Sequence, residues 1–326
     1  MRGRLIRWGR AIVGLLTSVA LLWLATRGLD WEALAENLAG VSITLLLGSL
    51  GVFMFASYVR AVRWRLLFAR NNISVARLFV IQNEGIGVNN VLPVRVGSEI
   101  TQLAVLTTRD GVNKATAVAT LGMERVIDVV ASTGILGVAF FFVPEMRSFA
   151  LYVWGAVGFA MVAVVGAILL ARGGTLAIVK RSPFLTALSR AIRDIERERL
   201  RLFGSFLASI AYWILVGVSA WIVSVAIKLP MSPVTATLVI MGTIFFATAV
   251  PAAPSAVGAF EWAVVYVLTF FGIERTAGFG YAVVIHAVFF LPPTIIAAIF
   301  LPGEGVLTLV RRRRLEASEA GAGPQR

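Results

Sequence analysis

Seven stretches of this chain are apolar over lengths close to the roughly 20 residues that cross a lipid bilayer as a helix. Hydrophobic residues make up 59% of the 326 residues and charged residues only 14%, which is far from the composition of a soluble domain. The sequence therefore predicts an all-α polytopic membrane protein. The apolar stretches are 11–26, 41–59, 115–143, 149–171, 203–227, 234–250 and 276–300.

Two short segments, 93–99 and 254–261, interrupt the apolar pattern in the same way. Each contains a Pro, then a Gly, then an acid, and both the Pro and the Gly recur 161 residues later, close to half the chain length of 326. Proline removes a backbone donor and glycine tolerates conformations closed to other residues, so a helix is expected to break at each segment. Paired breaks in two halves of a hydrophobic chain point to a transporter-type site built from broken helices.

The first break follows the segment 78–92, which holds too many polar side chains for a span that faces lipid. We expect a re-entrant hairpin that turns at 92–93 and returns through 98–108. The second break splits 234–271 into two arms, each long enough to be a full span. The prediction is six to eight transmembrane helices with two broken hairpins related as inverted repeats. It is one membrane domain over 1–310, with pseudo-repeats near 41–143 and 203–300.

The net charge of +13 could suggest nucleic acid, so the distribution of the charge matters. Assigned to alternate sides of the membrane, 24 of the 30 Lys and Arg residues fall on one side. By the positive-inside rule that side is cytoplasmic, and both termini lie there. The basic excess therefore reflects topology and anionic lipid headgroups, and no nucleic-acid partner is expected. The basic tail 311–326 is predicted to be cytoplasmic and disordered.

Several kinds of chemistry lack the residues they need. The chain has no Cys and a single His, His286, so a disulfide framework, a thiolate nucleophile, a metal centre and a Ser/His triad are not expected. We interpret His286 as a hydrogen-bonded core residue. No nucleotide-binding loop of the form G-x-x-x-x-G-K-[ST] is present. The sequence predicts no catalytic residue, no cofactor and no enzyme activity.

Charged residues at membrane depth are rare without a reason, because each costs about 2.5 to 3.5 kcal/mol on insertion scales. Glu124 and Asp128 lie four residues apart and so share a helical face with Arg125, which could meet Arg95 or Glu99. One interpretation is a water-accessible midplane site in which Arg95 holds a phosphate and the acids bind a cation or a proton. The alternative is that these groups pair with one another and only fix the helix register.

Other polar residues have simpler interpretations. Arg60, Arg63, Trp64 and Arg65 end the second apolar stretch and are typical of an interfacial anchor. The basic segment 172–201 is amphipathic, and its Ile192 and Ile195 suit a lipid surface. Glu84 and the neighbouring Gln82 and Asn83 could simply satisfy open backbone in the first hairpin.

Three motifs in order resemble the flippase-like membrane domain of lysylphosphatidylglycerol synthases, which also occurs as a stand-alone bacterial and archaeal protein. The segment from Asn90 to Glu99 is similar to the family pattern N-x-L-P-x-R-x-G-E. The segment from Glu124 to Asp128 is similar to E-R-x-x-D, and the segment from Pro251 to Glu261 is similar to P-x-x-P-G-G-x-G-x-x-E. The resemblance covers nearly the whole chain.

The chain also departs from that pattern. Ser98 lengthens the spacing from Gly to Glu, Gln102 stands where the family has Arg, and Ser255 and Ala256 replace a pair of glycines. These changes could alter headgroup preference or the approach of a ligand to the backbone. No soluble segment remains for an aminoacyl-transferase domain, so lipid aminoacylation by this chain alone is not expected.

The resemblance implies a multi-pass protein of a bacterial or archaeal cell membrane and a flippase-type function. The lipid would be an anionic phospholipid, a glycolipid or a polyprenyl-linked lipid. A second hypothesis is a non-transporting subunit that scaffolds a glycosyltransferase or a lipid-modifying enzyme; an intramembrane enzyme is a weaker third. The residues expected to bind lipid are Asn90, Pro93, Arg95, Gly97, Glu99, Glu124, Arg125, Asp128, Pro254, Gly258 and Glu261.

Overall fold

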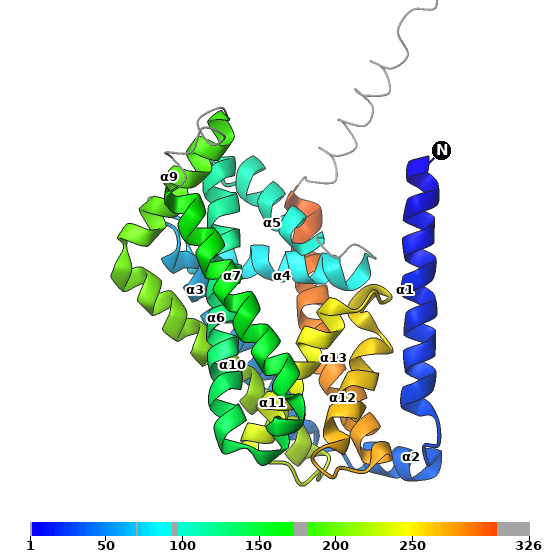
Figure 1. Ribbon diagram of the computed structural model, residues 1–326. Helices are drawn as coiled ribbons and strands as arrows, with labels where there is room; N and C mark the ends of the chain where they lie inside the picture. The colour runs from blue at the N-terminus through cyan, green and yellow to red at the C-terminus, as the bar shows by residue number, and fades with distance from the viewer. Residues whose placement is uncertain (1, 70, 93–96, 173–181, 305–326) are drawn as a thin grey trace, which may run out of the picture.

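The computed structural model of the chain describes residues 2–69, 71–92, 97–172 and 182–304, which form α-helices and short 3₁₀ helices without any strand (Figure 1). Within these residues five helices are long and apolar enough to cross a membrane, or six if α1 is counted with α2, to which it is bent by 88°. The predicted all-α polytopic architecture is therefore confirmed.

The helices follow one another along the chain with short connections. The α-helices are α1 Arg2–Thr26, α2 Trp31–Ala39, α3 Ile43–Leu66, α4 Val75–Val91, α5 Gly97–Thr108, α6 Lys114–Phe142, α7 Ala150–Arg172, α9 Pro183–Arg197, α10 Arg199–Ala226, α11 Pro233–Ala249, α12 Ala259–Thr269 and α13 Arg275–Phe300. The 3₁₀ helices are η1 Pro144–Phe149, η3 Pro254–Ala256 and η4 Leu301–Glu304.

Seven of the twelve α-helices in the described residues start after a capping residue. A side-chain oxygen of each cap accepts a hydrogen bond from a backbone N–H of the first helical turn, which leaves one fewer donor unsatisfied. Such caps precede seven helices, at Asp30, Ser42, Ser74, Asn113, Ser182, Ser232 and Glu274.

The bundle has two chemically distinct ends. At one end, called the basic end here, lie the C-terminus of α3, the start of α4, the turn between α5 and α6, α9 and η4; contacts such as Arg77 to Asp110 and Arg201 to the Phe68 carbonyl join them. At the opposite end, the backbone N–H of Ser42 donates to the Ala226 carbonyl and Arg275 donates to the Leu24 carbonyl. Figure 1 shows the basic end at the top.

Helices α3 and α10 run antiparallel and pack closely through small residues. Ser49 Oγ donates to the Ser219 carbonyl at 2.8 Å, and Ser219 Oγ donates to the Ser49 carbonyl at 3.0 Å. Both serines are buried. Small side chains let helix backbones approach in a membrane, where hydrocarbon gives no hydrophobic drive for association. These two helices therefore form the central pair of the bundle.

Each broken segment forms a hairpin that enters the bundle and turns back. The first, α4 and α5, starts and ends at the basic end, where Arg77 contacts Asp110. The second, α11 and α12, starts and ends at the opposite end, where Phe270 stacks edge-on against Phe149 of η1. The arms α4, α5, α11 and α12 have 17, 12, 17 and 11 residues, at or below the shortest length of about 17 residues that spans a bilayer. The expectation that each arm of the second break is long enough to be a full span is therefore wrong for α12.

The tips of the two hairpins meet inside the bundle. Ser255 Oγ, in the second break, donates to the carbonyl of Asn90, near the end of α4, at 2.5 Å. The second tip also lies beside the middle of α1, because the Ala253 N–H donates to Ser18 Oγ at 2.7 Å. The end of α4 and the second break therefore lie side by side inside the bundle.

The two halves of the chain repeat one order of elements. A long helix is followed by a 17-residue helix, a break, a helix of 12 or 11 residues and a second long helix, as α3 to α6 and again as α10 to α13. The hairpins enter from opposite ends, which is the arrangement of inverted repeats. The bounds of the domain and of the pseudo-repeats stay predictions.

One surface interpretation is wrong. The apolar face of α9 does not lie free for lipid, because Ile192 and Ile195 are buried against the core formed by α3 to α6. Ser189 Oγ also donates to the carbonyl of Ala171 at the end of α7. The amphipathic pattern does mark a helix, α9. The apolar face of this helix packs on neighbouring helices, which offer the same apolar contact as lipid would.

Candidate functional site

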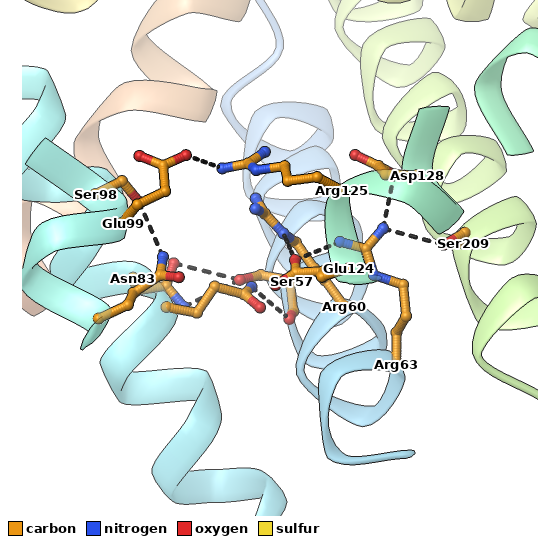
Figure 2. A network of polar contacts seen from close by, with 12 residues as sticks. Ser57, Arg60, Arg63, Asn83, Ser98, Glu99, Glu124, Arg125, Asp128 and Ser209 are labelled. Atoms are coloured by element: carbon orange, nitrogen blue, oxygen red, sulfur yellow. Dashed lines mark hydrogen bonds and ion pairs between the residues drawn. The ribbon is translucent and has the colours of Figure 1, made fainter. Parts of the chain in front are cut away.

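A cluster of buried charges lies where α3, α6 and α10 meet (Figure 2). Arg63 has no solvent exposure, and its guanidinium donates to Glu124 at 2.5 Å, to Asp128 at 2.7 Å and to Ser209 Oγ at 3.1 Å. Because Glu124 and Asp128 lie one helical turn apart on α6, a single planar guanidinium can hold both carboxylates. The expectation that these two acids share an inward face is correct.

Aromatic side chains of α10 complete this cluster. The ring of Tyr212 lies 5.7 Å from the guanidinium carbons of both Arg60 and Arg63, and the Trp213 Nε1–H donates to Asp128 at 3.1 Å. Cations over aromatic faces gain electrostatic stabilisation that grows when water is excluded. Arg60 contacts Glu124 through Nε alone, at 3.3 Å, and among the described residues no hydrogen bond occupies its terminal nitrogens.

A second ion pair joins the returning arm of the first hairpin to α6. Arg125 Nη2 donates to Glu99 Oε1 at 2.5 Å, and the two side chains are 49% and 37% exposed. Arg125 lies 11 residues from the start of α6, which is about 16 Å along the helix at 1.5 Å per residue. This half-exposed pair therefore lies near the middle of the bundle, and the prediction that Arg125 could meet Glu99 is confirmed.

Buried polar side chains of α4 lie beside these charges. Asn83 Oδ1 accepts from Ser57 Oγ at 3.2 Å, and Asn83 Nδ2 donates to the Phe79 carbonyl at 2.7 Å. Gln82 Nε2 donates to the Ser57 carbonyl at 3.4 Å. These two amides satisfy backbone and neighbouring groups, as one interpretation held. Glu84 differs, because neither of its buried carboxyl oxygens has a hydrogen-bond partner within the described part of the chain.

The acid of the second break has a different environment. Glu261 Oε2 accepts from the Gly258 N–H at 2.6 Å and so caps the start of α12, while Oε1 lies 2.5 Å from Nδ1 of His286 on α13. The interpretation of His286 as a hydrogen-bonded core residue fits this contact. Within the described residues no hydrogen bond or ion pair links Glu261 to the Arg63 cluster. The ionic groups therefore form separate networks, not one shared cluster.

The backbone of the second break is held in an uncommon conformation. Ser255, Ala256 and Gly258 have φ values of +59°, +57° and +83°, a region that glycine adopts freely and other residues rarely do. A Cβ on Gly258 would collide with the Ser18 carbonyl of α1. The family's Gly pair is thus replaced by two residues that keep a glycine-like backbone. Pro254 begins η3, the single turn between the two arms.

The remaining predicted lipid-binding residues lie near the meeting point of the tips. Asn90 Nδ2 donates to Thr294 Oγ1 at 3.0 Å and to the Phe290 carbonyl at 3.2 Å, which fixes the end of α4 on α13. Gly97 begins α5 and packs on Val88. Pro93 and Arg95 lie outside the described residues, as does the tail 311–326.

The sequence interpretation of Arg63 and Trp64 as an interfacial anchor is wrong. Both side chains are fully buried, because the last turns of α3 are covered by α6 and α10. Arg60 and Arg63 were therefore missed as members of the site. A signal was present, since they are spaced i, i+3 and two acids on another apolar helix require buried cations. Sequence alone does not say which helix packs on which.

A metal centre finds no support in the described residues, which contain no group of three or more His, Asp or Glu side chains placed to hold an ion. What the residues offer instead is paired charges at membrane depth. The ion pairs of Arg60 and Arg63 with Glu124 and Asp128, and of Arg125 with Glu99, lie beside the first hairpin, and the pair of Glu261 and His286 lies at the second.

Comparison with known proteins identifies the class of this membrane protein. A family model described as lysylphosphatidylglycerol synthase TM region matches residues 11–297, so the chain belongs to that family. The resemblance seen in the three motifs is thereby confirmed. No curated protein and no solved structure matches the chain.

Proposed function

We propose that this chain binds the anionic headgroup of a membrane lipid and moves the lipid between leaflets. The candidates are an anionic phospholipid, a glycolipid and a polyprenyl-linked lipid. The basic end would face the cytoplasm of a bacterial or archaeal cell, with both termini there. Family membership supports a membrane role, whereas the transport role is our proposal.

The observation that carries the proposal is the half-exposed ion pair of Glu99 and Arg125 near mid-depth. An ion pair facing hydrocarbon would be strongly unfavourable, so the exposed side of this pair implies a water-filled space. Such a space beside two facing helix breaks is how secondary transporters build a midplane site. Arg125 and the terminal nitrogens of Arg60 are the donors that would meet a headgroup phosphate.

Relative motion of the hairpins would carry the headgroup across. They enter from opposite ends, and among the described residues a hydrogen bond from Ser255 to the Asn90 carbonyl joins them where they meet. A small contact between two separately anchored arms can open and close with little loss of packing elsewhere. Pro93 and Arg95 stay predicted lipid contacts.

Liposomes test this function. The purified chain is reconstituted, and the loss of fluorescence of labelled phosphatidylglycerol, phosphatidylcholine and a polyprenyl phosphate is followed after a quencher is added outside. We expect the anionic lipids to move faster than phosphatidylcholine. The R125Q variant loses one charge-assisted contact, worth about 1.5 to 3 kcal/mol, and should move them roughly tenfold more slowly or worse.

The matched control is R201Q, because Arg201 is 44% exposed at the start of α10 and lies outside both charge networks. This variant should move lipids at the parent rate. Lipid movement no faster than in protein-free vesicles, for every lipid tested, would overturn the proposal and favour the alternative of a non-transporting scaffold for a lipid-modifying enzyme. Equal slowing in R201Q and R125Q would show that the effect is not specific to the site.

A further inference from the structure

Glu84 is a buried carboxyl that neither charge network uses. It lies on α4 with no solvent exposure, and both of its oxygens lack a hydrogen-bond donor within the described part of the chain. Burying a charged carboxylate without a partner costs far more free energy than one hydrogen bond contributes, and such groups take up a proton instead. The neutral acid is therefore the form that this environment favours.

The surroundings of Glu84 explain what its ionisation would disturb. Glu304 of η4 is the charged group that acts on Glu84 most strongly, followed by Arg77 and Asp110. Arg77 lies seven residues before Glu84, two turns away on the same face of α4. The faces of α3, α5 and α13 packed on this part of α4 carry the neutral Ser57, Ser98, Gln102 and Ala297. Among the described residues, two acids and one arginine therefore dominate the electrostatic surroundings of Glu84.

Those three residues form a cluster that closes the open end of the first hairpin, where α4 begins and α5 ends; the open end of a hairpin is called its mouth here. Arg77 donates to the two oxygens of Glu304 at 2.5 and 2.8 Å, and to Asp110 at 3.0 and 3.1 Å. Arg109 donates to the Gly303 carbonyl at 2.7 Å. The cluster of Arg77, Asp110 and Glu304, called the latch here, ties the start of α4, the turn after α5 and the end of α13 together.

We propose that Glu84 is a proton-binding site that controls this latch. The inference rests on the proposed transport function and names the proton as its coupling ion. With a proton bound, neutral Glu84 leaves Arg77, together with Arg109 at 3.7 Å from Glu304, to balance the two latch carboxylates. When Glu84 releases the proton to water entering the mouth, a third carboxylate faces the same guanidinium and repels Glu304. The latch then loosens, and the first hairpin separates from α13.

Distance measurements test the latch directly. The chain contains no Cys, so a pair of thiols introduced as T108C and P302C can carry spin labels without a background. Both positions are exposed, one at the end of α5 and the other in η4. In liposomes at low pH we expect one short label-to-label distance, and as pH rises a longer distance should replace it. The E84Q variant should keep the short distance at every pH.

Control variants make the result decisive. E196Q removes an exposed acid of α9 and should keep the full pH response. R77Q removes the guanidinium of the latch and should show the long distance throughout. If E84Q does not fold, E84M offers a neutral side chain of similar volume. A pH response in E84Q equal to that of the parent, or no pH response in the parent, would overturn the proposal.

Lipid movement in the same vesicles separates the two proposals. If Glu84 couples transport to protons, the parent rate depends on pH, and E84Q removes that dependence. Lipid movement that is independent of pH in the parent would contradict the proton site but support the flippase function. A pH-dependent latch without movement of any lipid would support the proton site but contradict the flippase function.

Discussion

The two hairpins have the same kind of Pro and Gly break, but their arms carry different side chains. The arms α4 and α5 bury a series of polar side chains, including Gln82, Asn83 and Gln102, and they border the charge cluster on α3 and α6. The arms α11 and α12 carry one charged residue, Glu261, which caps its own helix and pairs with His286. A duplicated turn therefore sets the geometry twice, whereas the arms decide which hairpin can bind charge.

The mouths of the hairpins differ in the same way. At the basic end, ion pairs of Arg77 with Asp110 and Glu304 hold the first mouth. At the opposite end, the contacts near the second mouth are hydrogen bonds to backbone groups, such as the Glu274 carboxylate at the start of α13 and Arg275 on the Leu24 carbonyl of α1. Ion pairs respond to pH and salt, while backbone caps respond little, so the first mouth is the better candidate for a moving part.

The largest expected effect concerns the charge cluster beside the first hairpin. The R63M variant leaves Asp128 without its cation and Glu124 with only the longer contact to Arg60, and breaking a buried pair in this way costs about 3 to 5 kcal/mol. Unfolding in mixed detergent micelles, followed by Trp fluorescence, measures the loss. R201M, at an exposed contact, serves as the control and should change the free energy of unfolding by less than about 0.5 kcal/mol. Equal losses would mean that the cluster is not the stabilising element.

The next effect compares the two equivalent glycines. G258A places a Cβ against the Ser18 carbonyl at a positive φ, and we expect a loss of about 2 to 4 kcal/mol. G97A places its Cβ 3.5 Å from Val88, an ordinary contact, and should stay within about 0.5 kcal/mol of the parent. The same unfolding measurement applies to both. A G97A variant as unstable as G258A would show that the two elbows are under equal constraint.

A smaller effect tests the strained pair at the second break. Replacing Ala256 by Gly removes the strain of its positive φ and should stabilise the fold by about 0.5 to 1 kcal/mol. Ser255 has the same strain, but S255G also loses the hydrogen bond to the Asn90 carbonyl, worth about 1 kcal/mol, so it should be nearly neutral. Thermal midpoints of the two variants measure the difference. If both were equally stabilising, the contact between the tips would contribute nothing.

The smallest effect is at the second mouth. The N–H groups of Thr276 and Ala277 hold the pKa of the Glu274 carboxyl below its ordinary value. This contribution is present above the pKa of the unfolded chain, near about 4.3, and is lost as pH falls through the lower pKa of the folded state. The E274Q variant should lose roughly 0.3 kcal/mol at neutral pH and nothing in acid. A loss independent of pH would contradict the charge-based account.

Much of the fold was predictable because its signals are local. Apolar length marks the long helices, and Ser, Asp or Asn caps mark where they begin. Pro and Gly mark the two elbows, since a missing donor and a freed φ act within one turn of chain. The first hairpin was predicted to turn at 92–93 and return through 98–108, and the structure has α4 ending at Val91 and α5 spanning Gly97–Thr108.

The candidate site was predictable only in part. The spacing of Glu124 and Asp128 fixes a common face, because both lie on one helix. Their partner Arg63 comes from α3, and the sequence pattern around it is the same whether the guanidinium meets headgroups or buried acids. Glu84 and Glu304 lie 220 residues apart, and no periodicity relates them.

The sequence by itself therefore determined the membrane class of this protein, its family, its helices and the position of its two breaks, because hydropathy, capping and backbone freedom are properties of neighbouring residues. Only the tertiary structure decided which charges pair, which of two equivalent glycines has no room for a Cβ and which acid stays unpaired. Those outcomes depend on which helices touch, and contact between distant segments is set by the packing of the whole bundle.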